Sequence, residues 1–392
     1  MMSSERVVVA MSGGVDSSVT AALLLERGFE VIGITMRLGL QDGDDQNPSR
    51  SSCCSIESVE DARRVADRLG IPFYALNFEA IFKEEVVDYF CNEYSAGRTP
   101  NPCIICNEKL KFGKLLHIAR ELEADYVATG HYARISQDAE TGRYILRKGI
   151  DARKDQSYAL FSLTQDQLKH TLTPLGDYTK PQVRSIAESL SLRVAQRPES
   201  QELCFISDDD YSRFLREHMV DSIQPGPMLD MAGKVVGQHQ GIQFYTIGQR
   251  KGLGSFGKPM YVVKIDAQAN AIVIGTNDDL LIDRLTASGA NFISIPKLDR
   301  PMKVTVKIRY NDPGATATAL PLSDNSSQDE FIPASRFEVV FDQPRRAVTP
   351  GQAVVLYDDD IVLGGGWIDD PERPQNPLPM EQNALMRETP AT

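Results

Sequence analysis

The stretch SGGVDSS, from Ser12 to Ser18, carries residue types that could hold an anion. It follows a short apolar run and precedes a segment with helical periodicity, which predicts a tight turn leading into a helix. Glycines let the backbone fold closely, and the amides at a helix N-terminus point at a negative group, with serine hydroxyls as further donors. Asp16 could hold a magnesium ion beside bound phosphates. The absence of Gly-Lys-Ser/Thr excludes a Walker loop, while an ordinary glycine turn that caps a helix stays open as the alternative.

Two cysteines far apart in the sequence, Cys106 and Cys204, could handle sulfur. Cys106 lies in GRTPNPCIICNEKLKF, where the two prolines are expected to stiffen a loop that presents the thiol. The lysines that follow would favour a nearby thiolate and attract RNA phosphate. One thiol could carry a transferable sulfur as a persulfide while the other attacks or resolves it, with a disulfide forming as sulfur leaves. The pair therefore predicts a sulfur relay.

Other uses of these cysteines remain open from the residues alone. Cys103 and Cys106 form a Cys-x-x-Cys pair, which suggests zinc or redox work, but the sequence has no second such pair for a four-cysteine zinc site. Cys103, Cys106 and Cys204 could instead bind three irons of a 4Fe–4S cluster and leave the fourth open to hydrosulfide. The remaining cysteines are expected to pack inside the fold: Cys53, Cys54 and Cys91.

Strands and helices alternate through the first part of the chain. The expected strands are 6–11, 29–36, 73–76 and 126–129, and the expected helices are 15–27, 57–69, 86–94 and 110–122. This alternation predicts an α/β fold with a doubly wound parallel sheet. Ligands of such sheets bind at the carboxyl ends of the strands, so the site is expected at the turns 12–18, from 36 onward, and 130–131.

The pattern changes to short alternating runs after residue 215. Strands are expected at 243–247, 261–265, 271–274, 303–308, 337–341 and 353–357. The chain therefore divides into an N-terminal catalytic domain (1–215), a small β-rich central domain (216–282), a C-terminal β-barrel that binds RNA (283–370) and a disordered tail (371–392). The acidic run 358–360 is expected in a hairpin turn rather than a metal site.

Composition limits the functional classes. The chain has 392 residues, a formal net charge of −12 and 42% hydrophobic residues, as expected of a globular protein with several domains. The sequence has no apolar run of about eighteen residues, and its start, MMSSERVVVAMSGG, lacks the long apolar region of a signal peptide. A cytoplasmic location is therefore expected. The acidic balance disfavours a non-specific nucleic-acid coat protein but allows a local basic patch.

The phosphate loop resembles the PP-loop of the ATP pyrophosphatase superfamily, which implies cleavage of ATP between its α and β phosphates and transfer of AMP to a substrate oxygen. Over nearly its whole length, to about residue 368, the chain resembles the tRNA-specific 2-thiouridylases. Besides SGGVDSS, the segments that carry this resemblance are SCCS (52–55), DARRVADRLGIPFY (61–74), TPNPCIICN (99–107), ATGHYAR (128–134), KDQSY (154–158), ESQELCFI (199–206), YTIGQRKGLG (245–254), VKIRYND (306–312) and RAVTPGQAVVLYDDD (346–360).

The resemblance implies roles for particular residues. Cys106 would be the nucleophile and Cys204 the persulfide carrier, with a transient disulfide between them. The residues implied to contact ATP are Ala10, Met11, Ser12, Gly13, Gly14, Val15, Asp16, Ser17, Met36 and Gly130. Those implied to meet the target base are Asn101, Pro102 and Cys103, and those implied to contact tRNA are His131, Lys154, Asp155, Gln156, Arg309, Tyr310 and Gln352.

A reaction and its partners are implied as well. ATP with Mg²⁺ would adenylate the C2 oxygen of a wobble uridine in tRNA, and sulfur from the Cys204 persulfide would replace that oxygen, giving 2-thiouridine, AMP and pyrophosphate. A protein persulfide would donate the sulfur to the enzyme, which is expected to be a monomer without a membrane partner. The chain departs from a common family pattern at Cys103, where many members have an aspartate that could bind the base or shuttle a proton.

Two other functions stay open without the resemblance. A PP-loop ligase that acts on a small metabolite would need neither paired cysteines nor an RNA-binding barrel. A non-enzymatic RNA-binding or metal-binding module would not need an intact phosphate loop. Taken alone, His131 could be a structural histidine and 154–156 a solvated turn. Basic and aromatic residues on the β modules favour RNA, and they are Arg250, Lys251, Arg309, Tyr310, Arg345 and Arg346.

Overall fold

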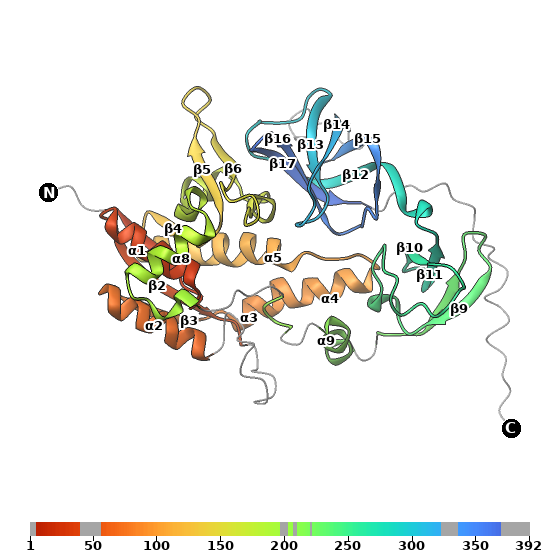
Figure 1. Ribbon diagram of the computed structural model, residues 1–392, viewed down its shortest axis with the longest axis horizontal. Helices are drawn as coiled ribbons and strands as arrows, with labels where there is room; N and C mark the ends of the chain where they lie inside the picture. The colour runs from red at the N-terminus through yellow and green to blue at the C-terminus, as the bar shows by residue number, and fades with distance from the viewer. Residues whose placement is uncertain are drawn as a thin grey trace.

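The computed structural model describes residues 5–39, 56–196, 203–206, 210–219, 222–322 and 336–369. The expectations for Cys53, Cys54 and the tail 371–392 concern residues outside this described part. The N-terminal domain lies at one end of the molecule and the central domain at the other, with the C-terminal barrel above them (Figure 1). Among the described helices, none combines the length and the apolar character that a membrane span requires.

Five parallel strands form the sheet of the N-terminal domain, in the order β3-β2-β1-β4-β7. They are β1 (Arg6–Ala10), β2 (Glu30–Arg37), β3 (Phe73–Asn77), β4 (Tyr126–Ala128) and β7 (Thr171–Leu172). Val7 and Val9 of β1 pack in one core cluster with the helices α1 (Val15–Glu26), α2 (Ile56–Leu69) and α8 (Lys180–Ser189). Val8 belongs to the cluster on the opposite face. Burial on both faces explains the continuous apolar run of β1 and confirms the predicted doubly wound parallel sheet.

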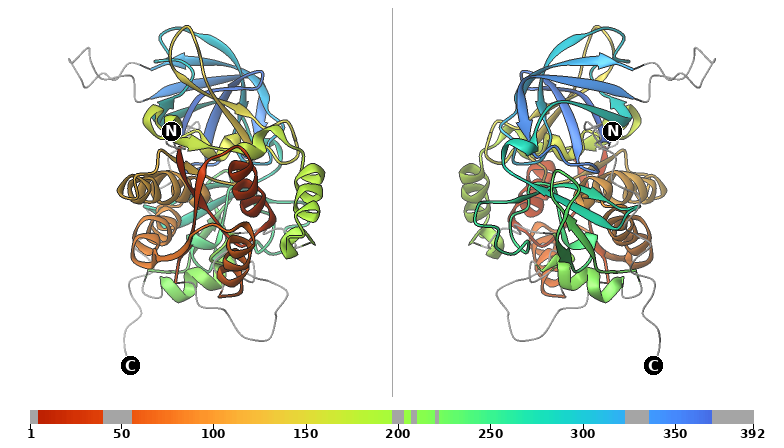
Figure 2. Two further views of the ribbon diagram at one scale, coloured as in Figure 1. Left: turned by 90° about the vertical axis from the view of Figure 1, so that its left-hand side faces the viewer. Right: turned by 90° about the vertical axis from the view of Figure 1, so that its right-hand side faces the viewer.

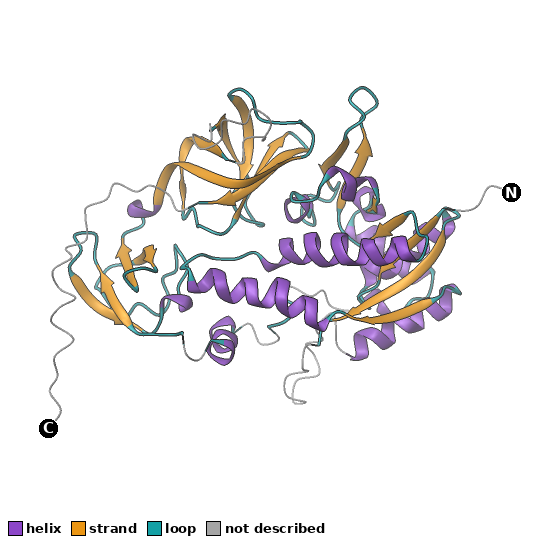
Figure 3. Ribbon diagram, turned by 180° about the vertical axis from the view of Figure 1, so that it is seen from behind, coloured by secondary structure: helices purple, strands orange, loops and turns teal. Residues whose placement is uncertain are grey.

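Two long helices run side by side from this sheet toward the central domain (Figures 1 and 3). The first consists of α3 (Glu79–Phe82), the π-helical η1 (Lys83–Val87) and α4 (Asp88–Ser95). The second consists of α5 (Pro102–Ile105), the π-helical η2 (Cys106–Lys114) and α6 (Leu115–Glu121). The helices predicted at 86–94 and 110–122 are therefore parts of longer ones.

The interpretation that a loop presents Cys106 is wrong, because the helix already begins at Pro102. Asn101 is the N-cap, and its side chain accepts a hydrogen bond from the amide of Ile104. Pro102 occupies the first turn. Backbone N–H groups in the first turn have no partner within the helix, so the N–H that proline lacks is not missed there. Pro102 thus starts a helix, and Cys106 lies in a helical segment close to its start.

The central domain is a sheet with the order β10-β11-β8-β9. Its strands are β8 (Gly226–Leu229), β9 (Val235–His239), β10 (Tyr261–Asp266) and β11 (Ala271–Gly275), and α9 (Tyr211–His218) precedes them. The strand predicted at 243–247 is wrong. The chain forms the 3-10 helix η6 (Ile242–Phe244) there, because this turn lets Phe244 and Tyr245 both pack into the core. The short helices elsewhere are η3 (Ser157–Leu160), α7 (Gln165–Lys169), η4 (Pro174–Asp177), η5 (Arg193–Gln196) and η7 (Asp278–Leu280).

The C-terminal domain is a closed antiparallel barrel. Its strands are β12 (Leu281–Phe292), β13 (Met302–Lys307), β14 (Ala315–Pro321), β15 (Phe337–Arg346), β16 (Ala353–Asp358) and β17 (Ile361–Ile368). Pairing of β12 with β17 closes the ring. The side views show the barrel, in blue, seated over the N-terminal domain (Figure 2). The expected barrel is therefore confirmed.

A hairpin of the N-terminal domain, β5 (Ala133–Gln137) and β6 (Tyr144–Lys148), extends the barrel sheet through the pairing of β6 with β17. The acidic run lies in the β16–β17 turn, as predicted. Its Asp360 accepts hydrogen bonds from Arg134 at 2.7 Å and Arg147 at 2.9 Å. The acidic turn therefore links the C-terminal barrel to the β5–β6 hairpin of the N-terminal domain through these two contacts.

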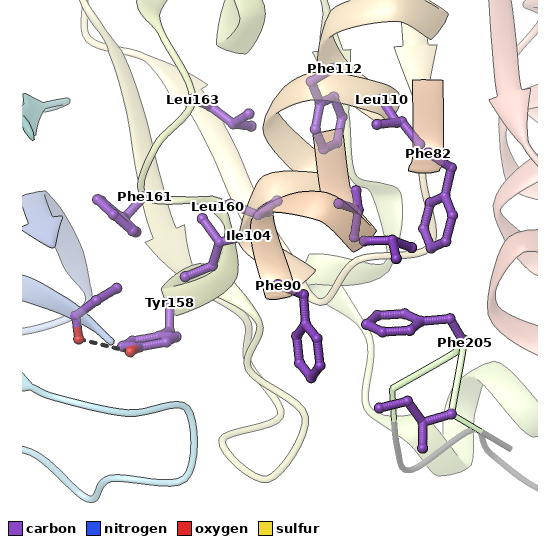
Figure 4. Packing of buried hydrophobic residues seen from close by; sticks show 14 of the residues in the cluster. Phe82, Phe90, Ile104, Leu110, Phe112, Tyr158, Leu160, Phe161, Leu163 and Phe205 are labelled. Atoms are coloured by element: carbon purple, nitrogen blue, oxygen red, sulfur yellow. Dashed lines mark hydrogen bonds between the residues drawn. The ribbon is translucent and has the colours of Figure 1, made fainter. Parts of the chain in front are cut away.

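Buried hydrogen bonds also connect the barrel to the N-terminal domain. The hydroxyl of Tyr158, which is fully buried, donates to the carbonyl oxygen of Ala353 at 2.8 Å (Figure 4). The hydroxyls of Ser157 and Tyr357 lie 3.2 Å apart, also in the interior. These contacts fix the barrel against the segment that follows the β5–β6 hairpin.

We expect Tyr158→Ala to lower the free energy of unfolding by about 3–5 kcal/mol, because it leaves a cavity at the domain interface. Tyr158→Phe should cost only about 1 kcal/mol, the value of one buried hydrogen bond. Urea denaturation measures the free energy of unfolding of both variants. Tyr74→Phe is the control, because Tyr74 is half exposed. Equal stability of Tyr158→Ala and the wild type would contradict the buried interface.

Candidate active site

The loop after β1 has the shape of an anion cradle. Gly13 adopts φ 72°, and a Cβ atom at this position would lie 2.2 Å from the carbonyl oxygen of Ser58, so only glycine fits. Gly14 is the N-cap of α1, and as a glycine it has no side chain to cap this helix end. The amides of the first turn of α1 can therefore bind a phosphate group, which the positive end of the helix dipole also favours.

The serines shape this loop. The Ser17 hydroxyl accepts the amide of Ser12 at 3.1 Å and donates to the carbonyl oxygen of Gly14 at 3.2 Å. The Ser18 hydroxyl donates to the same carbonyl oxygen at 2.8 Å. Each hydroxyl has a single proton, so these two serines hold the loop in shape, and the exposed Ser12 is the serine that can donate to an anion.

The residues expected to contact ATP meet at one edge of the sheet. Ala10 ends β1, Met36 lies near the end of the neighbouring β2, and Gly130 follows β4. The Thr35 hydroxyl donates to the carbonyl oxygen of Met11 at 2.6 Å and ties the loop to β2. A Cβ atom at Gly130 would lie 2.9 Å from the backbone of Asp16, so the turns after β1 and β4 touch. The residues expected to contact ATP thus lie at the carboxyl ends of the strands, where ligands of such sheets bind.

Asp16 has partners that the sequence did not reveal. Lys180, the first residue of α8, places its Nζ 2.8 Å from both carboxylate oxygens, and the Tyr132 hydroxyl donates to Oδ1 at 2.7 Å. Local sequence carries no signal for these contacts, since Lys180 lies in a separate helix. The Asp16 side chain is 33% exposed, and a carboxylate offers about four acceptor positions, so it can still give an oxygen to Mg²⁺.

The barrel holds the start of the helix that carries Cys106. Gln352 donates from Nε2 to the carbonyl oxygens of Thr99 at 3.1 Å and Pro100 at 3.0 Å. Of the residues expected at the target base, Asn101 caps the helix, Pro102 is buried and Cys103 is exposed. Cys103 is therefore the one of the three whose side chain faces solvent.

Charged side chains on the same helix surround the second turn. Lys109 forms an ion pair with Glu108 at 3.0 Å, and this neighbour raises the pKa of Lys109. Lys111 donates to the Oδ1 of Asn107 at 2.8 Å. The two lysines lie within a few residues of Cys106, as expected, but Glu108 offsets part of their charge.

Cys204 lies beside a cluster of aromatic rings. The next residue, Phe205, has its ring centroid 5.2 Å from Phe90, 5.8 Å from Phe82 and 5.2 Å from Phe214. Figure 4 shows Phe205 facing the helix of Phe90, next to the helix that begins at Pro102. Cys204 and Cys106 are both half-buried and pack against one core cluster, to which Ala10 and Met36 at the nucleotide edge also belong.

The residues expected to contact tRNA divide into two groups. Arg309 and Tyr310 are exposed on the barrel. His131 and Asp155 are buried instead: His131 bonds Thr129 at 2.7 Å, and burial with the charge of Lys111 lowers its pKa well below the ordinary value.

The other members of this set serve internal contacts. Gln156 accepts the amide of Tyr132 at 3.0 Å through its Oε1, Gln352 binds the carbonyls described above, and Lys154 is half-buried. The structural interpretation of His131 therefore agrees with its surroundings, and Arg309 and Tyr310 are the candidates for direct RNA contact.

The described residues do not fit a metal cluster. Among them, no group of three or more His, Cys, Asp or Glu side chains is placed to hold a metal ion. Cys103 is exposed, whereas Cys106 and Cys204 are half-buried. The expectation of a 4Fe–4S cluster at these three cysteines gains no support from their placement.

We expect Gly13→Ala to weaken ATP binding at least about tenfold, because the added methyl group must push the loop away from Ser58. Gly28→Ala is the matched control. Gly28 also has a positive φ, 89°, but a Cβ atom there would meet nothing within 4 Å. The positive φ should cost each variant about 1–2 kcal/mol of stability, and Gly13→Ala should lose more because of its contact with Ser58. Titration calorimetry should find the loss of ATP affinity only in Gly13→Ala.

Known families match the chain along its length. The family described as tRNA methyl transferase HUP domain matches residues 5–208, the tRNA methyl transferase PRC-barrel domain matches 212–276, and the aminomethyltransferase beta-barrel domain matches 282–368.

Whole proteins of known name are also similar. The chain is 51% identical over 368 residues to the tRNA-specific 2-thiouridylase MnmA of Acetivibrio thermocellus, covering 94% of this chain and 100% of that protein. It is 54% identical over 366 residues to the protein of the same name from Heliobacterium modesticaldum, covering 93% and 92% of the two chains. The chain therefore belongs to the tRNA-specific 2-thiouridylase (MnmA) family.

Proposed function

We propose that the protein is an ATP-dependent tRNA 2-thiouridylase that replaces the C2 oxygen of a wobble uridine with sulfur. The observation that carries this proposal is that Cys106, Cys204 and Ala10, the residue at the end of β1 just before the glycine loop, pack against one core cluster in a chain of this family. ATP is one substrate, a tRNA with a wobble uridine is the other, and a protein persulfide supplies the sulfur. We expect the enzyme to act as a monomer in the cytoplasm.

The first step activates the uridine. The amides at the start of α1 bind the phosphates of ATP. Asp16 would hold Mg²⁺ in part, and the ion would offset phosphate charge when bound. The C2 oxygen of the uridine attacks the α-phosphate, and the bond to pyrophosphate breaks. This adenylation converts a poor leaving group into AMP. The uridine must leave the anticodon stack to reach the site, which costs a few kcal/mol.

The second step transfers sulfur. The terminal sulfur of the Cys204 persulfide forms a bond to C2, and the bond from C2 to the adenylated oxygen breaks, so AMP leaves with that oxygen. The Cys106 thiolate then attacks Sγ of Cys204, which frees 2-thiouridine and leaves a Cys106–Cys204 disulfide. The transferred sulfur gains the two electrons that the two cysteines lose, and a thiol reductant reopens the disulfide. Release of hydrosulfide by Cys106 before attack on C2 gives the same products.

Surface charge and aromatic groups offer a path for the RNA. Arg309 and Tyr310 are exposed on the barrel, and Arg250 and Lys251 are exposed in the glycine-rich loop of the central domain. Guanidinium and ammonium groups bind phosphate, and a tyrosine ring can stack on an unpaired base.

Cys103 stands where many relatives have aspartate, and we propose that it adjoins the base without serving as a strong proton acceptor.

We expect Cys106→Ser and Cys204→Ser each to abolish formation of 2-thiouridine, since each removes one thiol of the relay. Unmodified tRNA, ATP, Mg²⁺ and a persulfide donor are incubated with each variant, and the nucleosides are analysed by mass spectrometry. Because adenylation precedes sulfur transfer, both variants should still release pyrophosphate in a single turnover. Full thiolation by either variant would refute the relay.

Cys91→Ser is the matched control for these substitutions. Cys91 lies in α4, half-buried like the two relay cysteines. Burial, with the charge of Asp88, raises the pKa of its thiol to about 11, so it carries a proton at neutral pH and is a poor nucleophile. The variant should thiolate tRNA at the rate of the wild type.

A further inference from the structure

An ion pair at the phosphate loop has no role in the reaction described so far. Lys180 places its Nζ 2.8 Å from each carboxylate oxygen of Asp16, and the Lys180 side chain is only 9% exposed. Asp16 is the second residue of α1, within the turn whose amides form the anion cradle. The pair therefore lies next to the bound phosphates of the proposed function, on which this inference rests.

Several contacts hold Lys180 in this position. Its backbone amide donates to Oδ2 of Asp151 at 3.0 Å, and Asp151 is itself buried. Thr179 and Gln182 form a capping box at the same helix end. The Nζ also lies 5.8 Å from the ring centroid of Tyr132, whose hydroxyl binds Asp16. The fold thus holds the buried Lys180 ammonium group beside the Asp16 carboxylate.

Charge explains why such a pair would be needed. A phosphate cradle built from amides has only the partial positive charge of a helix end, about half an elementary charge. A full negative charge on Asp16 in the same turn would outweigh it and repel ATP, and this repulsion is strong where water is partly excluded. An aspartate placed to bind Mg²⁺ therefore weakens the binding of metal-free nucleotide, unless a nearby cation neutralises the charge of the aspartate.

We propose that Lys180 is a positioning residue of the nucleotide site, which neutralises Asp16 and holds it in place so that polyphosphate can approach α1. Lys180 acts through Asp16 and is not assigned a contact with the reacting atoms. A purely structural ion pair would instead affect stability alone, and removal of its second charge would not restore nucleotide binding.

Titration calorimetry with ATP in EDTA tests this proposal. Lys180→Met should raise the dissociation constant of ATP at least about tenfold, and Lys180→Arg should stay within about threefold of the wild type. The double variant Asp16→Asn/Lys180→Met should recover affinity to within about threefold of the wild type, because it leaves no uncompensated carboxylate. Lys303→Met is the surface control, since Lys303 forms a 2.7 Å ion pair with Asp342 on the barrel, where both side chains are exposed.

The outcomes separate this proposal from the proposed function. Wild-type affinity in Lys180→Met, or a double variant as weak as Lys180→Met, would overturn the role of Lys180 while ATP binding by the wild type stands. Absence of ATP binding in the wild type would overturn both. If Lys180→Met does not fold, Asp16→Asn alone decides: it should bind metal-free ATP at least as tightly as the wild type, and weaker binding overturns the proposal.

Discussion

The packing of Phe205 against Phe82 and Phe90 is the contact on which the account of sulfur transfer depends. It holds the segment of Cys204 against the pair of long helices, one of which carries Cys106. The same core cluster includes Val8 of β1, Val262 of the central domain and Tyr357 of the barrel, so one apolar interior joins all three domains. Dispersion and the loss of apolar surface from water make such a core close-packed and resistant to displacement. The two cysteines and the nucleotide edge are thus positioned by one packed interior.

Polar contacts then set the orientation of the barrel on this core. Asp360 receives Arg134 and Arg147, and Gln352 binds the carbonyl oxygens just before the helix of Cys106. Under the proposed function, RNA bound to the barrel would be connected through a few hydrogen bonds to the start of the helix that carries Cys106. The barrel is thus fixed on the N-terminal domain by packed and hydrogen-bonded contacts rather than held on a flexible tether.

Local patterns were enough to predict four of the five parallel strands, the glycine loop after β1 and three of the six barrel strands, because each depends on neighbouring residues. The hairpin β5–β6 was missed since its arginines, used to bind Asp360, interrupt the apolar alternation. The two prolines before Cys106 suggest a stiffened loop when they are considered alone, but Asn101 and Pro102 together are typical of a helix start. The Lys180–Asp16 pair could not be predicted, because it joins two helices that only the fold brings together.

The most direct test of the account follows one oxygen atom. A tRNA with ¹⁸O at C2 of the wobble uridine is incubated with the enzyme, ATP, Mg²⁺ and a persulfide donor, and the AMP is analysed by mass spectrometry. The account predicts one ¹⁸O atom in AMP for each 2-thiouridine formed, since the C2 oxygen leaves bonded to the α-phosphate. Formation of 2-thiouridine with unlabelled AMP would contradict adenylation of the uridine at its C2 oxygen.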